Sequence, residues 1–242
     1  MTTVFISDLH LSANSAQVLR HLSGVLHTHA VGADALYVLG DLFEIWLGDD
    51  AMAPEHRAVL ALFRGVRDSG TPVYFMRGNR DFLIGPEFVA VSGMHVLDDP
   101  CVVDLYGTRT LLMHGDLLCT DDTDYLAFRR QVRNPVWQEQ FLALSIPERI
   151  RMGREARSAS QDAGEKKNAE IMDANTLTVE QFMLEHRVHR LIHGHTHRPG
   201  VHKFTLAGQP AERIVLGDWH DFASVLVVDK QGYHLHDPRV SN

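Results

Sequence analysis

Seven Asp, His and Asn side chains directly follow short apolar stretches, at positions where a β-strand would end. They are Asp8, His10, Asp41, Asn79, His114, His195 and His197. The carboxyl ends of strands in an α/β sheet converge over one crevice, so we expect these side chains to lie close together. Carboxylate, imidazole and amide oxygen without a thiolate are ligands that favour Mn, Fe or Zn. The residue types and their spacing therefore predict a metal site.

The arrangement predicts two metal ions rather than one. Asp41 is the candidate bridge, because one carboxylate can share its charge between two cations. His195 and His197 are two residues apart, so their rings can reach adjacent ions. Two ions about 3.5–4 Å apart would activate a bridging hydroxide and hold phosphoryl oxygens during in-line displacement. Each motif alone is weak, but their repetition at successive strand ends predicts metal-dependent hydrolysis of a phosphoester.

The elements that must position these residues alternate between strand and helix. Buried strands are expected at 4–7, 35–39, 73–76, 111–113 and 190–192, each followed by candidate ligands. Helices are expected over 16–30 and over 54–67, the second with Pro54 in its first turn. Four segments after residue 200 indicate short antiparallel strands: 201–206, 213–216, 224–228 and 233–236. Together they predict a layered α/β sandwich with a mixed sheet.

Composition limits the class of protein. With 242 residues and 45% hydrophobic content, a single domain over 1–242 with a helical insertion over 122–172 is expected. The formal charge of −8 argues against a general nucleic-acid binder. No stretch reaches the roughly 18 apolar residues that a spanning helix needs. The N-terminus lacks the pattern of a signal peptide, and the two cysteines form no paired pattern, so reduced thiols in the cytosol are expected.

The insertion differs in charge from the rest of the chain. Residues 126–157 contain seven arginines against three acidic residues, a local charge of +4, with apolar residues interleaved. Pro135 and Pro147 should divide the segment into short helical pieces. One interpretation is a solvated helical insert with a small core of its own. The other is a lid that receives an anionic, partly apolar ligand or touches a membrane surface.

The motifs resemble those of the calcineurin-like metallophosphoesterases. The resemblance is carried by Asp8-Leu9-His10, Gly40-Asp41-Leu42-Phe43-Glu44, Gly78-Asn79-Arg80-Asp81, Met113-His114-Gly115-Asp116 and Gly194-His195-Thr196-His197. It implies a four-layer αββα fold. It also implies one metal on Asp8, His10, Asp41 and His197, and a second on Asp41, Asn79, His114 and His195. The catalytic residues that it implies are Asp41, Asn79, Arg80, His114 and His195.

Arg80 departs from the pattern of that family, in which a histidine at this place protonates a departing alkoxide. Arginine is a poor proton donor at neutral pH but a good bidentate clamp for phosphate. An alcohol leaving group, with a pKa of about 15.7 like that of water, needs a proton. A phosphate leaving group, with a second pKa of about 6, does not. Arg80 therefore favours a diphosphate substrate, unless it merely pairs with Asp81.

The sequence around these motifs, including the insertion, resembles the diphosphatases of lipid A biosynthesis. This resemblance implies that a metal-bound hydroxide attacks the α-phosphorus of UDP-2,3-diacylglucosamine, giving UMP and 2,3-diacylglucosamine 1-phosphate (lipid X). It implies two Mn²⁺ per chain and peripheral attachment to the cytoplasmic face of the bacterial inner membrane. No nucleic acid or protein partner is expected. The implied substrate contacts are Asn79, Arg80, Asp122, Ser160, Gly164, Lys167 and His195. Gly164 stands where that family would have a polar side chain, so only its backbone could contribute.

Two alternatives remain beside this hypothesis. One is a soluble pyrophosphohydrolase or phosphodiesterase for nucleotides, and the other is a scaffold that has the fold without catalysis. Several conspicuous residues are predicted to lie outside the site. Glu44 and Asp116 should orient histidines or loops, Trp46 and Trp137 should pack, and His193 should be buried. The remaining histidines are expected at the surface.

Overall fold

The computed structural model describes residues 1–12, 15–166 and 173–240, and the side chains of these residues except 159–166. One sheet has the order β11-β10-β1-β2-β3-β4. Its parallel strands are β1 (Thr3–Ile6), β2 (Ala35–Val38), β3 (Val73–Met76) and β4 (His95–Leu97). Strand β10 (Val225–Asp229) is antiparallel to β1, and β11 (Gly232–His236) is antiparallel to β10.

The second sheet has the order β5-β6-β7-β9-β8. Strand β5 (Cys101–Leu105) is antiparallel to β6 (Thr108–Met113), which is parallel to β7 (Arg190–His193). Strands β8 (Gly200–Leu206) and β9 (Gln209–Val215) form an antiparallel hairpin. The expected antiparallel pairing of the segments after residue 200 is confirmed by β8 with β9 and by β10 with β11, while β9 is in addition parallel to β7. The chain reverses into β8 at the sheet edge and again into β9, so β9 returns in the direction of β7.

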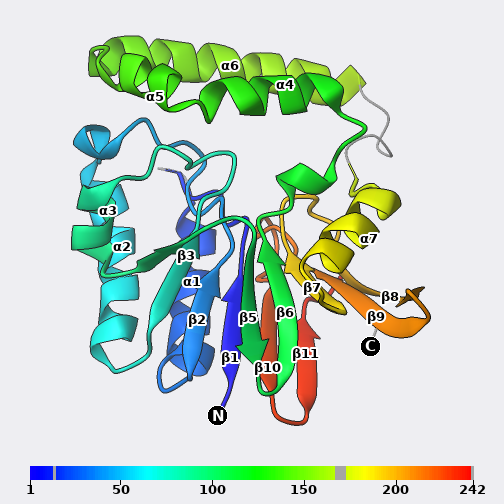
Figure 1. Cartoon of the computed structure of the whole chain (residues 1–242). Helices are drawn as coiled ribbons and strands as arrows, with labels where there is room; N and C mark the ends of the chain where they lie inside the picture. The colour runs from blue at the N-terminus through cyan, green and yellow to red at the C-terminus, as the bar shows by residue number, and fades with distance from the viewer. Residues whose placement is uncertain (13–14, 167–172, 241–242) are drawn as a thin grey trace.

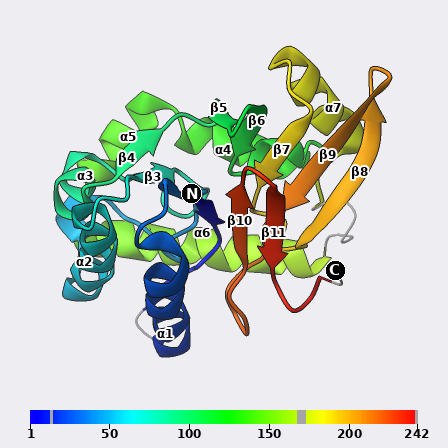
Figure 2. The ribbon, with the colours of Figure 1, turned by 90° about the horizontal axis from the view of Figure 1, so that it is seen from below.

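The two sheets pack face to face, with helices on both outer faces (Figures 1 and 2). Helices α1 (Ala16–Val25, continued as a π-helix over Leu26–Ala30), α2 (Pro54–Asp68) and α3 (Pro86–Ser92) cover the first sheet. Helix α7 (Thr176–Glu185) covers the second. This is the four-layer αββα arrangement that was predicted.

Side chains alternate across each buried strand, which explains why the strands are apolar on both faces. In β1, Val4 and Ile6 belong to the core under the helices, whereas Phe5 belongs to the core between the sheets. In β6, Leu112 faces the same central core, and Met113 packs with the residues under α7. These cores fix the carboxyl ends of the strands, where the candidate ligands begin.

Three further helices lie across those strand ends, at the top of Figure 1. They are α4 (Thr123–Val132), α5 (Pro135–Leu142) and α6 (Ile146–Lys166), and are called the lid helices below. Pro135 begins α5 after the cap Asn134, whose side chain accepts the Val136 N–H at 2.9 Å. The third piece is a single helix of 21 residues. Pro147 does not break it, because proline is tolerated in a first helical turn.

Arginines of the lid helices hold them to the domain beneath. Arg129 Nε donates to Asp116 at 2.7 Å, and Arg133 Nη2 donates to the Gly78 carbonyl at 2.8 Å. Two further arginines make equivalent contacts: Arg149 with Leu47 and Asp50, and Arg157 with Glu44. Part of the positive charge of this segment therefore serves internal contacts. Arg130, Arg151 and Arg154 are exposed.

We predict that replacing Arg129 by Leu destabilises the protein by about 3 kcal/mol, because it leaves a buried carboxylate without its cation. Asp116 is fully buried. Burial opposes its charge, but His114 and Arg129 outweigh burial and hold the pKa of Asp116 below its usual range. Denaturant unfolding at pH 7 measures the change. Arg130→Leu, at the adjacent exposed position, is the control, and a loss for Arg129→Leu no larger than that of the control contradicts the prediction.

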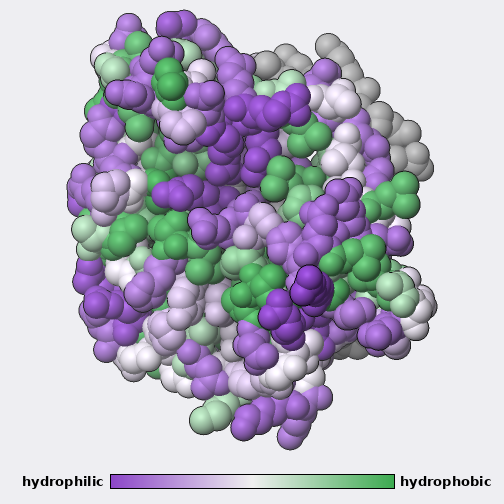
Figure 3. Space-filling model, in the orientation of Figure 1, coloured by the Kyte–Doolittle hydropathy of each residue, from purple (hydrophilic) through white to green (hydrophobic). Residues whose placement is uncertain are grey.

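The surface seen in Figure 3 mixes hydrophilic and hydrophobic side chains over the same elements. Hydrophobic side chains that remain exposed on the lid helices are Phe128, Val136, Leu142 and Ile146. Within the described part of the chain, no helix combines the length and the apolar character needed to cross a membrane.

Candidate metal centre and active site

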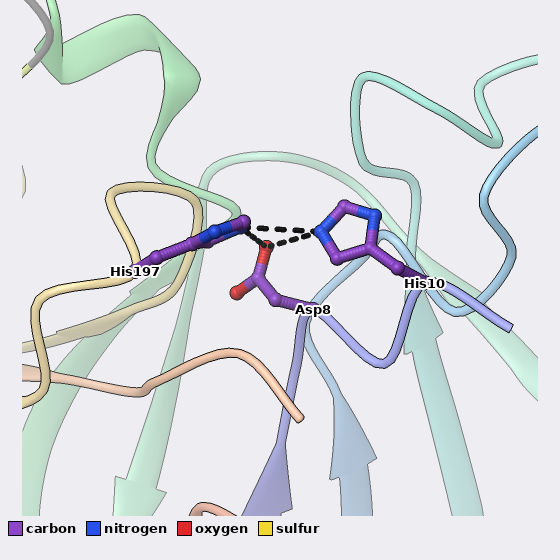
Figure 4. A group of neighbouring side chains, drawn as sticks. All are labelled: Asp8, His10 and His197. Atoms are coloured by element: carbon purple, nitrogen blue, oxygen red, sulfur yellow. Dashed lines mark hydrogen bonds and ion pairs between the residues drawn. The ribbon is translucent and has the colours of Figure 1, made fainter. Parts of the chain in front are cut away.

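The first ligand cluster consists of Asp8, His10 and His197, whose side chains point toward one another (Figure 4). The Nε2 atoms of the two histidines are 3.1 Å apart. Asp8 Oδ1 lies 3.5 Å from His197 Nε2 and 3.9 Å from His10 Nε2. This carboxylate oxygen is buried and has no hydrogen-bond partner among the described residues. Two ring nitrogens and this oxygen make three converging ligand atoms, a set that suits a divalent cation.

The second cluster consists of Asp41, His114 and His195, with Asn79 among them. Asn79 Oδ1 lies 2.8 Å from His114 Nε2 and 2.9 Å from His195 Nδ1. Asp41 Oδ1 lies 3.8 Å from His114 Nε2. The amide oxygen and the two ring nitrogens are all potential ligand atoms. Four side chains from four separate loops thus meet at one point.

Asp41 lies between the two clusters. Its Oδ1 faces His114 of the second cluster, and its Oδ2 lies 3.9 Å from His10 Nε2 of the first. One oxygen of the carboxylate is therefore directed to each cluster, as a bridge requires. The backbone N–H of Arg80 donates to Oδ1 at 2.8 Å and fixes the carboxylate. The structure brings all seven predicted ligand residues together.

Two histidines are oriented by contacts behind them. His114 Nδ1 lies 2.9 Å from the Leu39 carbonyl, which can only accept a hydrogen bond. With Nδ1 as the donor to this carbonyl, Nε2 is the nitrogen that would ligate a bound cation. His10 Nδ1 lies 3.1 Å from Glu44 Oε2, which has the same consequence. Glu44, predicted to orient a histidine or a loop, contacts a ligand histidine here. Asp116, with the same predicted role, accepts hydrogen bonds from Tyr125 and Arg129 of α4.

The clusters concentrate negative charge in a buried region. Burial lowers the pKa of His114, but Asp41, Asp116 and Asp8 outweigh it and raise the pKa to about 9. Burial raises the pKa of Asp8, but the contact with His197 and the neighbouring histidines hold it well below its usual range. Burial and the proximity of Asp41 raise the pKa of Asp81 to about 7. Cations bound here would neutralise carboxylates that otherwise repel one another.

The backbone of the clusters is unusual. Five of the seven candidate ligands have a left-handed conformation that non-glycine residues rarely adopt. The φ angles are 55° at Asp8, 48° at His10, 51° at Asp41, 67° at His195 and 55° at His197. The strands end in sharp loops, and these angles turn the side chains back over the sheet edge. Gly194 has no room for a Cβ, which would collide with Ser7 and Asp8.

The alternative interpretation of Arg80, a pairing with Asp81, is not what the structure shows. Asp81 is fully buried and accepts the backbone N–H groups of Leu42 and Gly78, each at 2.8 Å. It ties two ligand loops together. Arg80 Nε is buried without a hydrogen-bond partner in the described part of the chain. An unpaired guanidinium nitrogen beside the clusters is a candidate anion contact.

The implied substrate contacts within the insertion are only partly described. Asp122 is half-buried and is the N-cap of α4, where it accepts the Tyr125 N–H at 3.0 Å. Ser160 and Gly164 belong to α6, but their side chains are outside the described set. Lys167 lies outside the described residues altogether. The structure therefore brings Asn79, Arg80 and His195 to the site and leaves the four contacts within the insertion as predictions.

Other residues near the site could not be found from the sequence. Tyr125 donates to Asp116 at 2.7 Å, and its ring centroid lies 5.8 Å from that of His195. Trp46 packs as predicted, but it does so against His56, whose surface position was predicted wrongly. The His56 ring is half-buried between Phe43 and Trp46. Neither Tyr125 nor His56 belongs to a motif, so spacing gave no signal for either.

His193, which lies two residues before the ligand His195, is fully buried, as predicted. Burial and the charge of Arg213 lower its pKa to about 3, so the ring is neutral in the folded protein. In the unfolded chain the ring has a pKa of about 6.5 and binds a proton. The contribution of this ring to the free energy of unfolding is therefore fully present above pH 6.5 and is lost as the pH falls.

We predict that the metal-free protein loses roughly 1 kcal/mol of stability relative to a His193→Gln variant when the pH falls from 6 to 5. Denaturant unfolding of both proteins at the two pH values gives the difference. His27→Gln changes an exposed ring, so its free energy of unfolding should fall with pH as steeply as that of the wild type. Equal slopes for wild type and His193→Gln would mean that the buried ring does not control this step.

Comparison with known proteins agrees with the geometry. The calcineurin-like phosphoesterase family matches residues 1–199. A protein of Chromohalobacter salexigens named UDP-2,3-diacylglucosamine hydrolase is 51% identical, covering 90% of this chain and 89% of its own length. A protein of the same name from Serratia proteamaculans is 46% identical, covering 97% and 98%.

Solved structures show the same fold at low sequence identity. A structure described as a novel archaeal phosphodiesterase has a TM-score of 0.50 at 11% identity, covering 97% of this chain and 98% of that one. Vacuolar protein sorting 29 from Cryptosporidium parvum also has a TM-score of 0.50, at 13% identity, covering 100% and 94%. The matched family and the converging ligands lead to one conclusion. The chain belongs to the calcineurin-like phosphoesterases and, within them, to the family of the UDP-2,3-diacylglucosamine hydrolases.

Proposed function

We propose that this protein hydrolyses the diphosphate bond of UDP-2,3-diacylglucosamine in lipid A biosynthesis. Water attacks the α-phosphorus, and the products are UMP and 2,3-diacylglucosamine 1-phosphate. The observation that carries the proposal is the 46–51% identity, over nearly the whole chain, to proteins named for this hydrolysis. The convergence of all seven predicted ligand residues supports a working catalyst rather than a scaffold without catalysis.

The proposed cofactor is a pair of Mn²⁺ ions. Asp8, His10, Asp41 and His197 would hold one ion, and Asp41, Asn79, His114 and His195 the other. The buried, unpartnered Asp8 Oδ1 and the absence of thiolate from the clusters support this assignment. Bound there, the two ions would lower the pKa of a water and neutralise charge on the phosphoryl group.

Arg80 supports a diphosphate over an ordinary phosphomonoester. Its backbone N–H donates to Asp41, its Nε is buried without a partner among the described residues, and a guanidinium is a cation with five N–H donors and no acceptor. It can therefore neutralise charge on the departing phosphate but cannot supply a proton. A departing phosphate group needs none. A departing sugar alkoxide would need a proton donor, and Arg80 cannot take that role.

The lid helices support an acylated substrate over a soluble dinucleotide. A cavity of about 410 Å³ lies between them and the loop after β3, with Phe82, Leu83, Ile84 and Leu142 in its wall. Arg77 and Arg133 add positive charge to the same wall. We propose that residues 122–172 form the lid over the acyl chains and that Asp122, Ser160, Gly164 and Lys167 contribute contacts there.

The outer surface of the lid supports peripheral attachment to the cytoplasmic face of the inner membrane. Phe128 and Val136 are 45% and 60% exposed, and Arg130, Arg151 and Arg154 are exposed on the same three helices. Apolar and cationic side chains together suit an anionic lipid surface. Such attachment would bring the lid to a substrate whose acyl chains lie in the bilayer.

The test is phosphorus NMR of the manganese-loaded protein with UDP-2,3-diacylglucosamine in detergent and ¹⁸O-enriched water. Label in UMP is the expected result, because water then joined the α-phosphorus. Label in the lipid phosphate would place the attack on the β-phosphorus. No turnover, while a soluble dinucleotide or an aryl phosphodiester is cleaved, would leave a metallophosphoesterase with a different substrate.

A further inference from the structure

A second cavity of about 400 Å³ opens directly from the first ligand cluster, with Asp8 and His10 in its wall. The start of α1 contributes Ser15 and Gln17, and the loop after β9 contributes Asp218 and His220. The wall is tied to the ligand loop, because the Trp219 N–H donates to the Asp8 carbonyl at 3.3 Å. The cavity is thus continuous with the metal centre. Ser15, Gln17 and His220 add polar side chains that the proposed mechanism does not use.

The connectivity of the proposed substrate decides what can lie there. In a UDP-sugar lipid, the ribose is esterified to the α-phosphate, which is the group that reacts. The nucleoside must therefore lie within one ester linkage of the metal centre. The acyl chains are separated from the same phosphorus by the β-phosphate and the sugar. The cavity that holds the nucleoside should include ligand residues in its wall, whereas the acyl cavity need not.

The two cavities differ in this respect. The wall of the second cavity contains Asp8 and His10, while no candidate ligand lines the cavity with Phe82 and Leu142. The second wall also offers hydrogen-bonding groups that suit a nucleoside. Uracil offers two carbonyl acceptors and one N–H donor, and ribose offers hydroxyl groups, all of them uncharged. The Gln17 carboxamide can both donate and accept hydrogen bonds, as can the Ser15 hydroxyl, and the ring nitrogens of His220 offer a further hydrogen-bonding group.

Of the acidic residues in this wall, Asp8 belongs to the first ligand cluster, and the other two, Asp218 and Glu44, already contact arginines. Asp218 Oδ1 accepts a hydrogen bond from Arg239 Nη1 at 2.6 Å, and the Asp218 carbonyl accepts one from Arg239 Nη2 at 2.8 Å. Arg239 also pairs with Asp237, so Asp218 is part of a small ion-pair network. On the lid side, Arg157 closes the cavity and pairs with Glu44. We propose that this cavity binds the uridine half of the substrate and of the product UMP, an inference that rests on the proposed function.

The experiment is calorimetric titration of the manganese-loaded protein with UMP and, separately, with inorganic phosphate. Phosphate probes the metal centre alone, so the difference between the two ligands isolates the nucleoside. Gln17→Ala and His220→Ala should each raise the Kd of UMP by about three- to tenfold, the effect of one lost hydrogen bond. The Kd of phosphate should change by less than about twofold, because neither residue is itself a candidate ligand of the metals.

Gln138→Ala, in the wall of the other cavity, is the matched control and should leave the Kd of UMP unchanged. The proposal is overturned if UMP binds the wild type no more tightly than phosphate. It is also overturned if the Gln17→Ala,His220→Ala double variant binds UMP as the wild type does. The titration needs no turnover, so it is independent of the hydrolysis of UDP-2,3-diacylglucosamine, whose failure would contradict the proposed function instead.

Discussion

Replacing Asp41 by Asn is expected to lower kcat/KM for UDP-2,3-diacylglucosamine by about 10³-fold, since a preorganised charge at the reacting centre is lost. Asp41 directs one oxygen to His114 and the other to His10. An amide keeps the shape of the side chain but has only one acceptor oxygen and no negative charge. Both clusters should therefore lose affinity for their ions at once, whereas changing a ligand of one cluster affects one ion first.

The measurement is kcat/KM as a function of Mn²⁺ concentration, together with the metal content of the purified protein. Excess Mn²⁺ should restore only part of the activity, because the bridging charge is missing even when both ions are bound. Asp104→Asn is the matched control, since the exposed Asp104 lies in the β5–β6 turn and accepts the Gly107 N–H there. Normal metal content and activity in Asp41→Asn would exclude the bridging assignment.

The ligand residues could be predicted because their signal is local in the sequence. Each follows a strand that is buried on both faces, and such strands are continuous apolar runs that are easily recognised. Their convergence follows from the topology of the sheets rather than from any single motif. Asp8 and His197 are separated by most of the chain, yet their side chains are 3.5 Å apart because β1 and β7 end at the same edge of the sandwich.

Elements with weaker patterns were not predicted. Strand β4 has only three residues, and β5 is half-buried along most of its length, so neither shows a continuous apolar run. Helix α3 has seven residues, fewer than two full periods of a clear amphipathic pattern. The parallel pairing of β9 with β7 was not predicted either, because sequence patterns mark strands but do not give the partner of each strand.

The sequence also could not show which arginines of the lid helices point inward to an acidic partner and which point to solvent. Arg129 and Arg130 are adjacent in the sequence, but the first pairs with buried Asp116 and the second is exposed. Composition showed an excess of arginine in this segment and could not assign its partners. The left-handed backbone conformation of the ligand residues could not be predicted either. Asp and His rarely adopt it, so their presence does not indicate it as a glycine in a turn often does.

The glycine of the Gly-Asn-Arg-Asp motif provides the second large expected effect. A Cβ at Gly78 would lie 2.9 Å from Asp41 Cγ, and closer still to a carboxylate oxygen and to the backbone nitrogen of Asp41. Something must shift to relieve this contact, and the neighbouring group is the proposed bridge itself. A displacement of about 1 Å at a reacting centre can cost about 10²-fold in rate. We therefore expect Gly78→Ala to lower kcat/KM by about 10²-fold, measured with saturating Mn²⁺.

Gly65→Ala is the matched control, because Gly65 is exposed on α2 and an added Cβ would meet no atom within 4 Å. There the methyl group should stabilise the helix by about 0.5–1 kcal/mol and leave kcat/KM unchanged.

If Gly78 acts through Asp41, the effects of Gly78→Ala and Asp41→Asn on kcat/KM are not additive, because mutations at sites that share an interaction are energetically coupled. Gly78→Ala should then cost much less in an Asp41→Asn background than in the wild type. Full additivity in this double-mutant cycle would show that Gly78 supports the site by another route, such as its N–H contact with Asp81.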